Sequence, residues 1–62
     1  MSDEAKDKVL EIIGNTDGIK LLDLQFESDT YIVDLFHILE ALTKEDKIDL
    51  RVNGPFEYYH VV

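Results

Sequence analysis

Apolar residues recur at helical spacing near the start of the chain, and Leu10 widens the face that they form: Ala5, Val9, Ile12 and Ile13. Ser2 stands before two acidic residues, which predicts a helix N-cap there. Gly14 and Asn15 follow the last apolar position and indicate a left-handed stop. We therefore expect a first helix over about residues 3–13.

The strongest helical pattern predicts a helix from about Thr30 to Lys44, with Ser28 and Asp29 as N-cap candidates. Its inward stripe is expected to hold Ile32, Leu35, Phe36, Leu39 and Leu42, widened by Tyr31 and Ile38. Phe36 and Leu39 are predicted to be core residues. The opposite, solvent-facing side carries Asp34, His37 and Glu40.

The segment between these helices is ambiguous. Apolar residues from Ile19 to Phe26 fit a short strand that passes into a short helix, and neither period dominates. We predict extended backbone at Ile19 and Lys20, and a brief second helix from Leu21 to Phe26.

The last part of the chain has the alternation of β-structure. Ile48–Val52 alternates strictly between apolar and polar residues, and Phe56–Val62 is aromatic and β-branched. Because Pro55 has no N–H to donate after Gly54, a four-residue loop from Asn53 to Phe56 is predicted instead of a two-residue turn. Tyr58 and Tyr59 should point to opposite faces, one toward the helices and one outward.

This order of elements resembles the winged helix-turn-helix superfamily. The residues that carry the resemblance are Val9-Leu10-x-Ile12-Ile13, Ile32-x-x-Leu35-x-x-x-Leu39-x-x-Leu42, and Ile48-x-Leu50 with Asn53-Gly54 and Tyr58-Tyr59-x-Val61. The resemblance implies an α+β fold: three helical elements and a C-terminal two-stranded hairpin, or wing, in a single domain over residues 1–62. All of these are packing patterns, so they say little about function.

Within that superfamily, the chain is also similar to the small D subunit associated with dissimilatory sulfite reductase. That similarity rests on Glu4-Ala5-Lys6-x-Lys8-Val9 and on Ile38-Leu39-x-Ala41-Leu42. This chain lacks a tail after the hairpin. The similarity implies a reductase complex as the partner and its regulation as the role.

Charge disfavours the usual role of a winged helix. Fourteen acidic residues stand against six basic ones, a net charge of −8, and residues 21–43 contain no Lys or Arg. A DNA-reading helix needs Arg, Lys, Asn or Gln to match phosphates and base edges. A DNA-binding transcription regulator, and an acidic mimic that occupies a nucleic-acid-binding groove, are the alternatives to a protein-binding module.

Enzymatic chemistry is not indicated. The chain has no cysteine, no set of nucleophile, base and orienting group, and no glycine-rich phosphate loop. Asp34, His37 and Glu40 have a spacing that a divalent metal can use, but three polar residues on the solvent-facing side of an amphipathic helix are the better explanation. We expect no cofactor and no metal. The acidic start resembles no signal peptide, and the longest near-apolar run is too short to span a membrane, so a cytoplasmic protein is predicted.

The sequence instead predicts a regulatory module that binds a basic, partly apolar protein. A winged helix projects its third helix and its wing toward one side. The expected partner-binding surface therefore combines both elements: Asp34, His37, Glu40, Arg51, Phe56 and Tyr58. The sequence does not determine the oligomeric state, and a homodimer is one of the alternatives.

Overall fold

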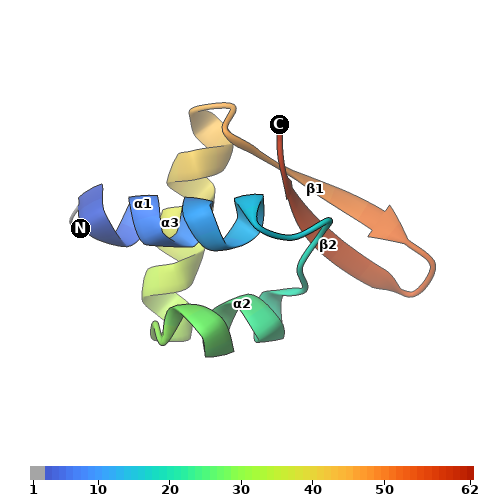
Figure 1. Cartoon of the computed structure of the whole chain (residues 1–62), viewed down its shortest axis with the longest axis horizontal. Coiled ribbons are helices and arrows are strands. Elements are labelled where there is room, and N and C mark those ends of the chain that lie inside the picture. Colours follow the sequence, from blue (N-terminus) through green and yellow to red (C-terminus); the bar gives the residue numbers. More distant parts are fainter. Residues whose placement is uncertain (1–2) are drawn as a thin grey trace.

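The computed structural model describes residues 3–62, in which three helices precede an antiparallel hairpin (Figure 1). This is the α+β, winged-helix-like arrangement that the sequence predicts. The elements are α1 (Asp3–Gly14), α2 (Leu21–Ser28), α3 (Ile32–Lys44), β1 (Ile48–Asn53) and β2 (Phe56–Val61). None of the helices in residues 3–62 is both long and apolar enough to span a bilayer.

Helix α1 ends differently from the prediction. Gly14 is its last residue, and neither Gly14 nor Asn15 has a positive φ, so the predicted left-handed stop is wrong. Thr16 ends the helix instead: its backbone N–H donates to the Ile13 carbonyl at 3.1 Å, and its hydroxyl donates to the same oxygen at 2.9 Å. A side chain thus satisfies a terminal carbonyl that a left-handed residue would otherwise serve. The capping role predicted for Ser2 lies outside the described residues.

The extended backbone predicted at Ile19 is confirmed, and it pairs with the hairpin. The Ile19 N–H donates to the Tyr59 carbonyl at 3.1 Å, and the Tyr59 N–H donates to the Ile19 carbonyl at 2.8 Å. Lys20 is also extended, with ψ of 155°. The predicted second helix is confirmed as α2 and runs two residues further, to Ser28. Residue 19 therefore acts as a short third strand beside β2.

The connection between α2 and α3 corrects the predicted N-caps. Ser28 is buried at the end of α2, where its hydroxyl donates to the Gln25 carbonyl, and Asp29 is the left-handed C-cap with φ of 51°. Helix α3 begins at Ile32 after the extended Tyr31, which makes no side-chain capping hydrogen bond. A short polar residue can serve either end of a helix, and Asp tolerates the left-handed conformation. Here both residues close the preceding helix.

The core lies where the three helices meet the base of the hairpin. Helix α3 contributes Leu35, Ile38, Leu39 and Leu42, and the remaining buried apolar residues are Val9, Ile13, Ile19, Leu24 and Ile48. The prediction for Leu39 is confirmed, since it is 3% exposed, but Phe36 is 49% exposed and that prediction is wrong. The buried arc of α3 is centred between Leu35 and Leu42. Phe36 lies 100° around the helix from Leu35, on the outward side of that arc.

The hairpin has a tighter turn than predicted. Asn53 pairs with Phe56, so Gly54 and Pro55 alone form the turn, and Gly54 has φ of 65°. A glycine with positive φ at the first central position matches a type II′ turn. The predicted four-residue loop is wrong. The loop has two residues, and it begins one residue later than the two-residue turn at Asn53 and Gly54 with which Pro55 would interfere. Pro55 then occupies a turn position at which no ladder hydrogen bond requires its N–H.

The two faces of the hairpin differ in their surroundings. Ile48 is buried, and Tyr59, which is opposite Leu50 in the register, packs against the core from the same face. Burial raises the pKa of the Tyr59 hydroxyl above its ordinary value. Tyr59 is therefore the inward member of the tyrosine pair. Tyr58 points to the other face, together with Arg51, which lies opposite it in the register.

An ion pair ties α1 to the residue that follows α3. The Lys6 ammonium donates to the Glu45 carboxylate, and Lys47 Nζ lies 3.1 Å from the other carboxylate oxygen. These hydrogen bonds, that of Lys6 before that of Lys47, lower the pKa of Glu45 below its ordinary 4.5. A lowered carboxyl pKa stabilises the fold above the unfolded pKa, and this contribution disappears as the pH falls through the folded pKa.

Glu45→Gln should therefore lower stability at neutral pH by a small amount, because the pair is exposed to solvent. The difference from the parent should shrink as the pH falls from about 4.5, where the carboxyl of the unfolded chain becomes protonated, through the lower pKa of the folded state. Urea unfolding of both proteins between about pH 7 and pH 3 measures this difference. A difference that stays constant down to pH 3 would contradict the assigned role of Glu45.

Candidate functional site

The acidic side chains predicted for the third helix are exposed on α3. The Lys44 ammonium lies 2.9 Å from the Glu40 carboxylate, one helical turn away, and its hydrogen bond lowers the pKa of Glu40. Asp34 and His37 border a hollow that α1 closes with Ala5. In residues 3–62 no group of three His, Asp or Glu side chains is placed to hold a metal ion. The acidic face of α3 therefore borders α1.

The residues predicted for the wing form a second group on the outer face of the hairpin. The Phe56 and Tyr58 rings make an edge-to-face contact with centroids 6.5 Å apart. Lys20 Nζ lies 4.7 Å from the centre of the Phe56 ring, a cation–π distance. Arg51, across from Tyr58, donates from Nε to Asp49 at 3.2 Å. The sequence did not indicate that Lys20 belongs with this group.

The structure brings the predicted partner-binding residues together as two groups rather than one. Asp34 and His37 border a hollow that α1 also lines, and Glu40 borders a second hollow on α3 alone, whereas Phe56 borders a hollow between α2 and the hairpin tip. Figure 1 shows the tip of the hairpin directed away from α3, at one end of the longest dimension of the molecule. A partner that contacts both groups would have to reach around the domain.

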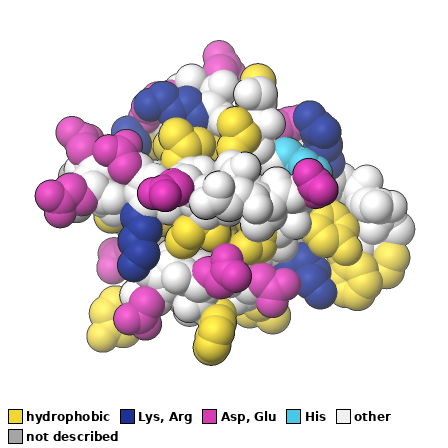
Figure 2. Space-filling view, viewed as in Figure 1, with side chains coloured by type: hydrophobic (Ala, Val, Ile, Leu, Met, Phe, Trp, Pro, Cys, Tyr) yellow, Lys and Arg dark blue, Asp and Glu magenta, His cyan; other side chains and the backbone are white. Residues whose placement is uncertain are grey.

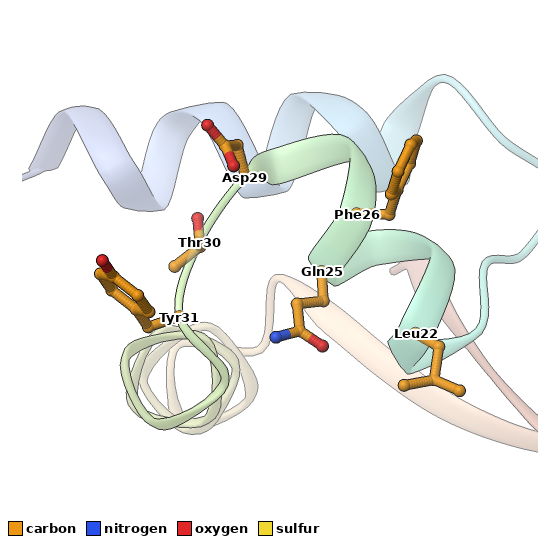
Figure 3. A pocket seen from close by; sticks show the side chains of 6 residues that line it. All are labelled: Leu22, Gln25, Phe26, Asp29, Thr30 and Tyr31. Carbon is orange, nitrogen blue, oxygen red and sulfur yellow. The ribbon is translucent and has the colours of Figure 1, made fainter.

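Exposed apolar side chains that the sequence did not single out lie on and beside α2. Leu22 is 74% exposed, Phe26 is 87% exposed and Tyr31 is 83% exposed. They border one hollow, together with Gln25, Asp29 and Thr30. Figure 3 shows Leu22 and Phe26 projecting from α2, and Tyr31 projecting from the start of α3. None of the three contributes to the core.

These side chains continue to the hairpin. Leu22 also borders the hollow between α2 and the hairpin tip, where Lys20, Pro55 and Phe56 complete the lining. Leu22 thus links the two hollows. We call the resulting surface the apolar strip, and it consists of Leu22, Phe26, Tyr31 and Phe56. In Figure 2 hydrophobic side chains project along the lower edge, over α2, and at the right, over the hairpin, with acidic side chains and a basic one between them.

The chain has no match among known protein families, curated proteins or solved structures.

The electrostatics of the apolar strip follow from its position in the chain. Asp23 and Glu27 each follow one of the exposed apolar residues of α2 and lie along one side of them, and Asp29 borders the same hollow as Phe26. Residues 21–43 contain no Lys or Arg, and Lys20 places a cation over the Phe56 ring at one end of the strip. The strip is therefore an apolar surface with an acidic border.

Proposed function

We propose that the protein is a small, non-enzymatic binding module that contacts another protein. The observation that carries the proposal is the apolar strip. Water covers three large side chains that are more than 70% exposed, beside the half-exposed ring of Phe56. Contiguous exposed apolar surface bordered by polar residues is typical of interaction sites, and aromatic side chains are enriched at the centres of interfaces. A partner that covers the strip would remove these apolar side chains from water, and with that the free-energy cost of their exposure.

The proposed role is regulatory, and the partner that the sequence resemblance implies is a reductase complex. That assignment rests on the resemblance alone. The surface supports only the broader proposal, which is a protein partner that is basic and partly apolar. Charge supports the same proposal, because a net charge of −8 attracts a basic surface and speeds association with it.

Photo-crosslinking in cells of the source organism tests the proposal. A benzophenone amino acid would replace Phe26, His37 or Glu11 in three separate versions of the chain, so that α2, α3 and α1 are each sampled. We expect at least one position to give a recurrent protein adduct after irradiation, identified by mass spectrometry. The proposal fails if no position gives an adduct beyond those of an unrelated acidic domain.

DNA binding is the rival function, because Arg51 on the hairpin and Lys20 beside its tip place two cations close to the wing. We expect no duplex binding, since the carboxylates of α2 and α3 would face phosphates without compensating bases. A fluorescence titration with mixed-sequence duplex at about 150 mM salt should give a Kd weaker than the ~10⁻⁴–10⁻⁶ M of non-specific binders. Micromolar binding that weakens steeply with added salt would contradict this expectation.

A further inference from the structure

We propose that the apolar strip is a docking site for one amphipathic α-helix of a protein partner, with Lys or Arg along the edge of that helix's apolar face. This inference rests on the proposed function and adds to it the surface and the chemistry of the segment that binds.

The apolar positions of the strip have the spacing that a helix requires. Leu22 and Phe26 are four residues apart on α2 and therefore lie one above the other on its exposed side. Helix α2 is 8 residues long, about 12 Å at 1.5 Å per residue, and the strip continues past both of its ends to Phe56 and Tyr31. A partner helix of three to four turns, roughly 16–22 Å, would cover this length with anchors at positions i, i+3 or i+4, and i+7.

The charges beside the strip select the flanks of that helix. Asp23, Glu27 and Asp29 are exposed: Asp29 lines the hollow of Phe26 and Tyr31, Asp23 lines that of Leu22 and Phe56, and Glu27 directly follows Phe26 in α2. Lys or Arg side chains that flank an apolar helix face would meet these carboxylates while their aliphatic stems covered the edges of Leu22 and Phe26. The same carboxylates disfavour a second copy of this chain, whose net charge is also −8.

An extended segment would dock elsewhere. Within residues 3–62, β2 pairs with β1 on one side and with Ile19 on the other, so β1 forms one open edge of the sheet. A partner strand would form its backbone hydrogen bonds along β1. The strip offers no such row of free backbone groups, because its largest part lies on α2, where the backbone is hydrogen-bonded within the helix. The strip therefore suits side-chain anchors.

The test uses a defined probe and the full chain. The probe is an amide-capped amphipathic peptide of about 18 residues, long enough for measurable helicity, with Leu and Phe on one face and Lys on both flanks. A matched peptide has Glu in place of every Lys. In ¹⁵N-labelled protein, we expect the Lys peptide to perturb the amide signals of Leu22, Phe26, Tyr31 and Phe56 most. The Glu peptide should bind at least about tenfold more weakly.

Two substitutions separate the strip from a general attraction to an acidic protein. Phe26→Ser should weaken binding of the Lys peptide by at least about tenfold. Val62→Ser is the matched control, since Val62 is 76% exposed and borders a different hollow, beside α1. It should leave the affinity unchanged. Both side chains are exposed, so both variants should keep the amide fingerprint of the folded parent.

The docking site is wrong if the perturbations centre on α1, on the acidic face of α3 or on the β1 edge. It is also wrong if the Glu peptide binds as tightly, or if Phe26→Ser has no effect. The crosslinking experiment separates this failure from failure of the proposed function. An adduct from position 11 or 37, without one from position 26, would leave a protein-binding module that uses another surface. Adducts from no position would overturn both.

Discussion

Leu39→Ala should lower the free energy of unfolding by about 2–5 kcal/mol, which is as large as the whole stability expected of so small a domain. Leu39 is 3% exposed and belongs to the stripe by which α3 packs into the core. Truncation would remove the transfer free energy of the side chain and leave a cavity between α3 and its neighbours. Urea unfolding followed by circular dichroism at about 5 °C, where a weakened fold is easier to populate, would give the difference.

Phe36→Ala is the matched control on the same helix. Phe36 is larger than Leu39, so a simple scale of side-chain size predicts a larger loss. Because half of its ring is already in water, we expect it to cost less than half as much as Leu39→Ala. Equal costs for the two substitutions, or a melting temperature of Leu39→Ala within two degrees or so of the parent, would mean that the assigned phase of α3 is wrong.

Gly18→Ala should destabilise the fold by about 1–3 kcal/mol, the next largest effect expected. Gly18 has φ of 129°, a conformation that residues with a Cβ rarely adopt. An added Cβ would lie 2.7 Å from Cε1 of His60 and 3.3 Å from Cβ of Tyr58. The imidazole can rotate away, but the Cβ of Tyr58 is fixed to the strand. The same urea measurement reports the loss.

Gly14→Ala tests whether that loss is specific to residue 18. Gly14 lies in α1, its φ is not positive, and an added Cβ would lie 3.5 Å from a methyl group of Val61, an ordinary contact. Alanine is the better helix former, so we expect a gain of up to about 1 kcal/mol. Similar losses for both substitutions would show that the backbone of Gly18 is not strained as described.

The sequence predicted all of the regular elements, most of them from a period that burial imposes, although neither period dominated in the segment that forms α2. The errors fall at the places where elements join. Ser28 and Asp29 have the chemistry of an N-cap, yet they end α2. In the hairpin the two turn residues are Gly54 and Pro55, one position later than the Asn53-Gly54 pair that has the chemistry of a two-residue turn. In both cases the residue types correctly indicated a junction between elements, but the sequence did not show which place each residue takes in it. Which of two adjacent positions takes the left-handed conformation depends on tertiary packing.

The candidate site was harder to predict than the fold. The sequence indicated Phe56 and the absence of Lys and Arg from residues 21–43, but it assigned Tyr31 to the inward stripe and left the outward direction of Leu22 and Phe26 unstated. One signal was present. Residues 21–26 hold four large apolar side chains, Leu21, Leu22, Leu24 and Phe26, and a helix this short cannot turn all of them toward one core. An excess of apolar residues over the buried arc indicates a second, outward-facing surface.

The pairing of Ile19 with Tyr59 also determines how the molecule comes apart. A two-stranded hairpin alone is marginal in water. Here two backbone hydrogen bonds join β2 to the segment between α1 and α2, and Ile19 itself is a core residue. Separating the hairpin would therefore open the centre of the helical layer at the same time. Hairpin and helices should form one cooperative unit, with amide protons of β2 and α3 exchanging through the same global opening.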